Sequence, residues 1–189
     1  MDSTLQVCSL VQIILNPDCR TVQGFQALVE REWLQAGHPF EIRCKHGPFV
    51  VPSNRTREQA PIFLLFLDCV YQIHQQFPCS FQYNENFLEF LFENSYSSKF
   101  GTFTGNCVKE RLDLGLEKKT ISIWSYLNRL EVMRNFHNPL YEPNNHILWP
   151  SVAPQSLVSF YCSFFFFSFF IFHLFCFILK TESLEKSLL

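Results

Sequence analysis

The sequence has no clear excess of charge of either sign. Its 189 residues include 15 lysines and arginines against 17 aspartates and glutamates, which gives a formal net charge of −2. Nucleic-acid-binding domains are usually basic, with lysine and arginine gathered on one face, so the composition predicts no nucleic-acid partner. The first residues, Met1-Asp2-Ser3, also lack the basic region and the apolar run of a secretory leader. We therefore expect a cytoplasmic chain.

Short catalytic motifs are also missing. The GxSxG turn, the Walker phosphate loop and the HExxH zinc motif do not occur. A thiol phosphatase needs an arginine six positions after its cysteine, because one loop must present both groups to one phosphate. The residues six positions beyond the eight cysteines are Ile14, Phe25, Val50, Gln75, Glu85, Asp113, Ser168 and Glu182. None is arginine, so no cysteine of this sequence has the partner that this chemistry requires.

The eight cysteines include no CxxC pair. They lie mostly inside apolar helical patterns or beside polar turns, which is typical of reduced thiols in a cytosolic protein. His38, Cys44 and His46 lie close together, but no second pair stands at the spacing of zinc ligands. We therefore expect no metal and no cofactor, and we expect His38 to cap or pack after Gly37.

Residues 60–77, APIFLLFLDCVYQIHQQF, form the segment around which the other helices are expected to pack. Most of the segment is apolar on every helical face, with Asp68 as its only charge. Such a helix belongs in a core or in a membrane. A length of about 25 Å and the polar residues near its end favour a core. Pro61 suits the first turn of this helix, and Pro78 ends it.

Apolar residues at helical spacing predict several further helices. These helices are expected at residues 3–15, 21–36, 84–96 and 106–114. Residues 120–134 are ambiguous, because their apolar spacing fits a strand at the start and a helix further on. Residues 44–60 are predicted to form a polar loop. Residues 135–155 should be irregular but packed, with Phe136, Leu140, Tyr141, Leu148 and Trp149 buried.

Two sets of polar residues deserve a functional test. Asp68 and His74 are six apart on the central helix, so they do not share a face closely. A hydrogen-bonding role for a buried Asp68 is favoured over a functional carboxylate. Glu30 and Glu32 are two apart and point to different faces, so we expect a solvated surface rather than a catalytic carboxylate pair.

The composition changes after residue 157. Residues 157–179 read LVSFYCSFFFFSFFIFHLFCFIL, with no charge and enough length to cross a bilayer core of roughly 30 Å. Three interpretations remain open: a transmembrane helix, a buried helix, and translation of non-coding pyrimidine-rich sequence. Ten phenylalanines in so short a run are hard to pack into a soluble core. A polar tail, residues 180–189, follows.

Much of the chain resembles a known family. The resemblance runs nearly continuously over residues 2–157, and within the family it is strongest to a catalytically inactive member. It is carried by residues 12–40, 60–88, 100–106, 122–128, 138–150 and 151–157. These segments resemble the C-terminal part of the myotubularin phosphatase domain. The resemblance implies the helical half of an α/β cysteine-phosphatase fold, with the parallel sheet preceding Met1.

The resemblance also implies which residues of this chain correspond to the active-site loop of the family. Active myotubularins are 3-phosphatases of phosphatidylinositol 3-phosphate and its 3,5-bisphosphate, and they use a CxxGWDRT loop followed by a helix. Asp2 matches the aspartate of that loop, Ser3 stands at its arginine position, and the nucleophilic cysteine would precede Met1. We therefore expect no catalytic residue in this chain.

These observations predict a mainly α chain with three parts. Residues 1–157 are expected to form a partial phosphatase-like domain, residues 158–179 a hydrophobic transmembrane helix, and residues 180–189 a polar tail. The family implies a pseudophosphatase that binds an active myotubularin paralogue and associates with phosphoinositide membranes. The alternative is a vestigial tail-anchored membrane protein from a truncated or mis-spliced gene model.

Overall fold

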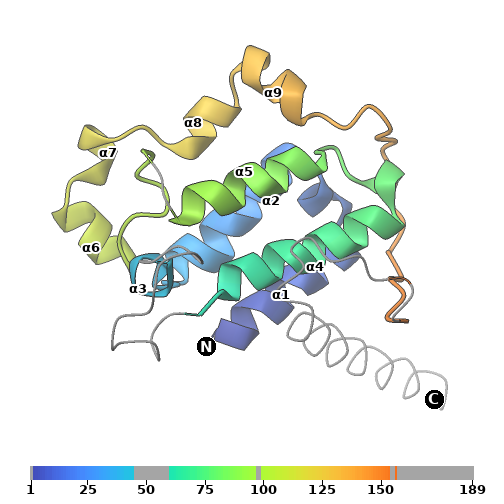
Figure 1. Cartoon of the computed structure of the whole chain (residues 1–189), viewed down its shortest axis with the longest axis horizontal. Coiled ribbons are helices and arrows are strands. Elements are labelled where there is room, and N and C mark those ends of the chain that lie inside the picture. Colours follow the sequence, from blue (N-terminus) through green and yellow to red (C-terminus); the bar gives the residue numbers. More distant parts are fainter. Residues whose placement is uncertain (1, 45–59, 97–98, 154–155, 157–189) are drawn as a thin grey trace.

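The computed structural model describes residues 2–44, 60–96, 99–153 and 156, and all regular elements of these residues are helices (Figure 1). The four longest α-helices are α1 (Asp2–Leu15), α2 (Val22–Val29), α4 (Ile62–Gln76) and α5 (Glu85–Tyr96). Helix α4 packs against both α1 and α5. Only two isolated β-bridges and no strand occur in the described ranges, which agrees with the predicted mainly α class.

Helix α4 is the buried central helix that the sequence predicts. Buried residues occupy every face of it, and the side chains of Phe63, Phe66 and Val70 are almost completely shielded from solvent. The helix begins directly after Pro61 and ends two residues before Pro78, as expected from the ring geometry of proline. Burying each large apolar side chain contributes about 1.5–3 kcal/mol, so α4 is a main source of stability.

The helix predicted at residues 21–36 is interrupted by a change of helix type. Thr21 caps α2, because its hydroxyl accepts a hydrogen bond from the amide of Gly24 at 3.0 Å. From Glu30 the chain continues as a π-helix, η2 (Glu30–Gln35). Trp33 and Leu34 are both buried in this turn, and the Trp33 indole donates to the Ser9 hydroxyl on α1 at 3.0 Å.

Four short helices of the described residues were not predicted. They are η1 (Pro17–Arg20), α3 (Phe40–Cys44), η3 (Pro78–Ser80) and α7 (Leu116–Lys119). Each has at most five residues, too few to show an apolar period in the sequence. Cys44, the first residue of the loop predicted at residues 44–60, is the last residue of α3. Residues 45–59 lie outside the described ranges, so the rest of that loop stays a prediction.

Residues 106–136 contain four short helices: α6 (Val108–Asp113), α7 (Leu116–Lys119), α8 (Ile123–Leu127) and α9 (Leu130–Phe136). Helix α6 begins two residues later than predicted, and the side chain of Asn106 accepts from the amide of Ile42 at 3.0 Å instead of capping the helix. The ambiguity at residues 120–134 is resolved in favour of helix, although Ile121 forms a parallel bridge with Phe100.

Residues 138–153 run without regular structure from α9 past the C-terminal end of α4 (Figure 1). Leu148 is buried as predicted, whereas the prediction was wrong for Leu140 and Trp149, which are 59% and 68% exposed. The amide of Leu148 donates to the carbonyl of Ile14 at 3.2 Å. Successive side chains of an extended segment point to opposite sides, so Trp149 faces out where Leu148 faces in.

The phenylalanine-rich run at residues 157–179 lies outside the described residues, so the predicted C-terminal hydrophobic helix stays a prediction. Within the described ranges, no helix has both the length and the apolar character that crossing a bilayer requires.

Candidate functional site

The first turn of α1 is where the resemblance places the end of a phosphate-binding loop. Asp2 is the first residue of the helix, and the side chain of Ser3 is exposed on its first turn. The amides of a helix N-terminus attract anions, but a serine hydroxyl is neutral. It cannot supply the charged two-point contact that arginine gives a phosphoryl group. The side chain of Ser3 is therefore accessible to solvent but uncharged.

Helix α1 is held firmly behind this turn. The side-chain amide of Gln6 donates to the carbonyl of Ile62 at 2.8 Å and so joins α1 to the start of α4. Leu10 and Ile13 are fully buried one and two turns further along. The first turn of α1 is thus presented by a helix whose remainder is part of the core.

The described thiols do not form a nucleophilic centre. The six described cysteines are free, and Cys8, on α1, is exposed. Burial raises the pKa of Cys19 above its ordinary value and raises the pKa of Cys44 to about 12. A nucleophilic cysteine needs a lowered pKa so that it is a thiolate at neutral pH. The thiols of Cys19 and Cys44 are therefore neutral packing groups.

The sequence analysis expected no metal site and expected His38 to cap or pack after Gly37. In the described part of the chain, no group of three or more histidine, cysteine or acidic residues is placed to hold a metal ion. His46 lies outside that part. His38 is buried, and its ring lies 5.0 Å from that of Trp33 and 4.7 Å from that of Phe40, in edge contacts.

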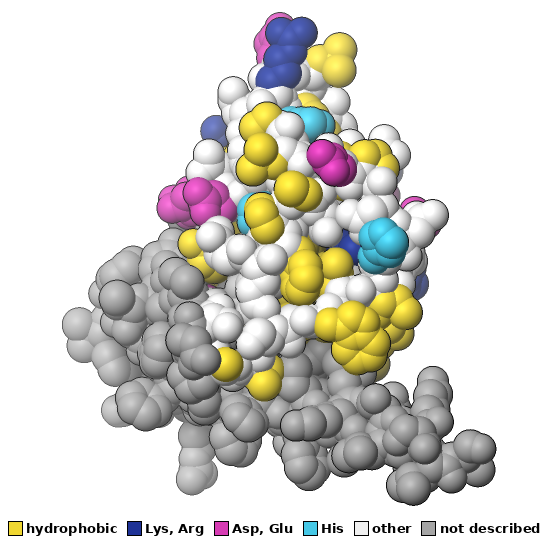
Figure 2. All heavy atoms as spheres, turned by 90° about the vertical axis from the view of Figure 1, so that its right-hand side faces the viewer, with side chains coloured by type: hydrophobic (Ala, Val, Ile, Leu, Met, Phe, Trp, Pro, Cys, Tyr) yellow, Lys and Arg dark blue, Asp and Glu magenta, His cyan; other side chains and the backbone are white. Residues whose placement is uncertain are grey.

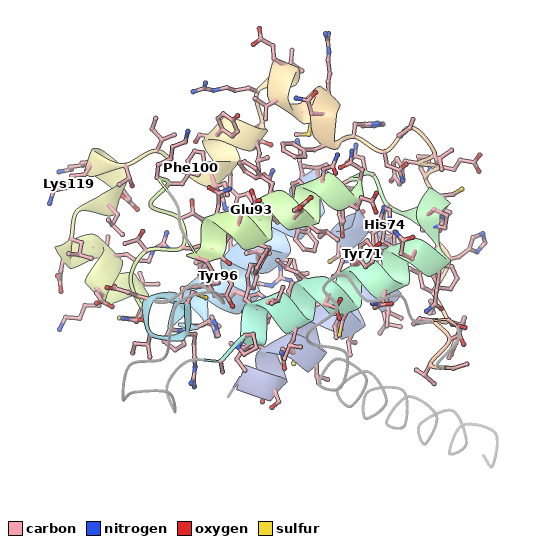
Figure 3. All side chains as sticks on the ribbon, viewed as in Figure 1. Tyr71, His74, Glu93, Tyr96, Phe100 and Lys119 are labelled. Carbon is pink, nitrogen blue, oxygen red and sulfur yellow. The ribbon has the colours of Figure 1, made fainter. Side chains whose placement is uncertain are left out.

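Asp68 and His74 are both buried on α4, and each has its own hydrogen-bond partner. The Gln72 amide lies 3.5 Å from the Asp68 carboxylate, in line with the predicted hydrogen-bonding role. His74 lies near the C-terminal end of α4 (Figure 3), and its Nε2 lies 3.1 Å from the carbonyl of Tyr83. Burial lowers the pKa of His74 below its ordinary value.

The two glutamates at the start of η2 accept more hydrogen bonds from other side chains than a solvated surface would predict. Glu30 accepts a hydrogen bond from the Trp124 indole at 2.5 Å, and Glu32 accepts from Gln12 and Arg31 at 3.0 and 2.8 Å. These bonds lower the pKa of Glu32, with that from Arg31 the largest cause. The glutamates point to different partners, so they are not a catalytic pair, but both are half-buried rather than fully solvated.

One buried cation was not predicted from the sequence. Arg20, the last residue of η1, is 1% exposed, and its Nη2 donates to the carbonyl of His146 at 2.9 Å. Its Nε and Nη1 have no hydrogen-bond partner among the described residues. Arginine is normally solvated, and the segments that meet Arg20, at Gln82 and His146, are far away in the sequence.

A cavity of about 360 Å³ opens between α6, α7 and α8. Its polar lining includes Thr102, Arg111 and Ser122, and the exposed side chains of Leu112 and Ile121 lie at it. The Arg111 guanidinium donates to the Thr102 carbonyl, and Thr102 Oγ1 accepts from the Ile123 amide. These polar groups are therefore committed to the fold.

The class of protein follows from comparison with a family model. The model of the myotubularin-like phosphatase domain matches residues 1–112. The chain belongs to the myotubularin family.

Individual relatives agree with this assignment. Myotubularin-related protein 9 from mouse is 60% identical over 156 residues, and that from human is 59% identical over the same length. Both alignments cover 82% of this chain and 28% of the relative. A human phosphatidylinositol-3,5-bisphosphate 3-phosphatase is 41% identical over 166 residues, covering 87% of this chain and 22% of the relative. The chain thus spans between about a fifth and little more than a quarter of the length of these relatives.

Proposed function

We propose that this chain is a catalytically inactive, pseudophosphatase-type member of the myotubularin family that regulates an active phosphatidylinositol 3-phosphatase. The observation that supports the proposal is Ser3, which is exposed on the first turn of α1, at the position that the resemblance assigns to the catalytic arginine. Phosphoryl transfer depends on charge held against the transferred group. A neutral serine at that position removes this charge, while the helical scaffold behind it is retained.

The absence of catalysis is tested with the purified 189-residue chain and two substrates, phosphatidylinositol 3-phosphate and the 3,5-bisphosphate. Phosphate release should equal that of a heat-denatured control. The Ser3→Arg variant should also stay at background, because no cysteine lies at the required spacing before residue 3 in this sequence. An active 3-phosphatase relative serves as the positive control. Turnover by the unmodified chain above the denatured control would contradict the proposal.

The regulatory role is tested by mixing the chain with an active 3-phosphatase of the family. Binding should appear as co-precipitation of the two purified proteins and as a change in the specific activity or thermal midpoint of the active enzyme. Since inactive family members act through their partners rather than through substrate, the effect should persist in the Ser3→Arg variant. If neither binding nor a change in activity is seen, the regulatory role is wrong.

We also propose a cytoplasmic, membrane-associated location, in which residues 157–179 bind lipid. The support is the composition of that run, which is uncharged over 23 residues. Fractionation should place the full chain with membranes and a chain cut after Leu157 in the soluble fraction. Equal partitioning of the two chains would refute the role of the run as an anchor.

A further inference from the structure

The guanidinium of Arg20 is a buried charge whose hydrogen-bonding capacity is only partly used. Its side chain is 1% exposed, and the described residues give it one hydrogen bond, from Nη2 to the carbonyl of His146 at 2.9 Å. Nε and Nη1 are buried without a partner in the described structure. Because guanidinium has five N–H donors and stays protonated in proteins, a buried arginine of this kind is costly unless an acceptor pairs with it.

No acidic side chain among the described residues pairs with Arg20. The ion pair found in the described ranges joins Arg31 to Glu32, at 2.8 Å. The groups that act electrostatically on Arg20 are Tyr141, Tyr83 and Cys19, and phenol and thiol side chains are ordinarily neutral at pH 7. The buried positive charge therefore lacks a counter-charge within this part of the chain.

A third unused polar group lies in the same region. Tyr83 is completely buried, and its hydroxyl has no hydrogen-bond partner in the described structure. The segment that carries Tyr83 is fixed beside η1, because the amide of Gln82 donates to the carbonyl of Arg20 at 3.0 Å and the Gln82 side chain accepts from the amide of Val22 at 2.8 Å. Two guanidinium nitrogens and one phenol are thus available on adjoining segments.

We propose that Arg20 and Tyr83 form a binding site for a single carboxylate, a property separate from the regulatory function proposed above. A carboxylate carries one negative charge, which neutralises the single guanidinium, and its two oxygens suit N–H and O–H donors. A phosphate dianion would leave a surplus negative charge in a buried site without a second cation. The carboxylate belongs either to a small organic acid or to an aspartate or glutamate of a partner polypeptide.

The carboxylate reaches Arg20 past the segment of residues 138–148. That segment lacks regular structure and covers η1 through the hydrogen bond from Arg20 to His146. The face toward which it runs is shown in Figure 2, where hydrophobic side chains are scattered among polar ones and charged side chains are few. His146, whose carbonyl accepts the hydrogen bond from Arg20, is itself exposed.

The test measures the thermal unfolding midpoint of the full chain in sodium formate and in sodium chloride at equal ionic strength and pH. Formate at about ten times its dissociation constant should raise the midpoint by about 3 °C relative to chloride. In Arg20→Met the two salts should give the same midpoint. Arg129→Met removes an exposed positive charge that lies over the Tyr126 ring, and it should keep the full formate effect.

Tyr83→Phe keeps the aromatic packing and removes only the hydroxyl, so it tests the site if Arg20→Met fails to fold. Its formate effect should be smaller than that of the unmodified chain. A blocked glutamyl peptide distinguishes the sources: stabilisation by formate alone indicates a small acid, and stabilisation by both indicates a side chain. Equal midpoints in formate and chloride, an undiminished effect in Tyr83→Phe, or a larger effect of inorganic phosphate would each overturn the proposal.

Discussion

His74 is a buried base with one ring nitrogen in use. Its Nε2 faces the carbonyl of Tyr83 at 3.1 Å and must donate to it, while Nδ1 is buried without a partner in the described structure. Protonation would place a charge and a further N–H where no described acceptor meets them. This arrangement explains why burial, the largest cause, lowers the pKa of His74 although the carbonyl of Tyr83 opposes the shift.

The lowered pKa predicts a pH-dependent stability. Because the unfolded chain binds the proton at a higher pH than the folded chain, the contribution of His74 is complete above the ordinary pKa of about 6.5 and is lost as the pH falls below it. Urea unfolding between pH 7.5 and pH 5 should show a decline of at most about 1.4 kcal/mol per pH unit from this group. His74→Gln should flatten the decline, whereas His137→Gln, at an exposed histidine, should leave it unchanged. An equal slope in all three chains would contradict the role of His74.

At the scale of elements, the first turn of α2 lies very close to η1, and the sequence does not reveal this contact. Gly24 lies in the first turn of α2, and a Cβ atom there would lie 1.8 Å from the carbonyl oxygen of Asp18 in η1. Real Cβ atoms do not approach a backbone oxygen so closely, so either η1 or α2 would have to move. A glycine that costs about 1 kcal/mol relative to alanine inside a helix is kept here by packing.

Gly24→Ala should therefore destabilise the chain, against the order of helix propensities. We expect a loss of about 1–3 kcal/mol, the range for overpacking, measured by urea unfolding. Gln23→Ala, at an exposed position of the same helix, should change stability by less than about 0.5 kcal/mol. If Gly24→Ala were neutral or stabilising, the close contact between η1 and α2 would not exist in solution.

The contrast between α4 and η2 shows how far the sequence could predict these elements. The continuous apolar run and the flanking prolines were enough to predict α4, since both are local signals. The π turn at Glu30–Gln35, the burial of Arg20 and the exposure of Trp149 depend on contacts with segments far away in the chain. The candidate site at Asp2 and Ser3 came from resemblance alone, because a serine in a first turn has no chemical signature of its own.

For the whole molecule, burial is concentrated in one half. Helices α4 and α5 carry many fully buried side chains, whereas α6, α7 and α9 carry none. Leu130, at the start of α9, is 80% exposed. Figure 1 shows α6 and α7 at the edge of the molecule, away from the packed α1, α4 and α5. The described part of the chain thus combines a well-packed core with a thinly attached periphery.

This distribution predicts two classes of amide hydrogen exchange. Amides of α4 should exchange only through global unfolding, while those of α6 and α7 should exchange through local opening, because local stability follows buried apolar contact. In low concentrations of urea, exchange from α4 should accelerate with the slope of global unfolding, and exchange from α6 and α7 should respond little.

Asn138, whose side chain donates to the carbonyls of Pro78 and Phe81 at 2.7 and 2.8 Å, provides the matched variant. Asn138→Ala should accelerate exchange in α4 by lowering global stability and leave α6 and α7 unchanged, and uniform exchange rates across the chain would contradict the division.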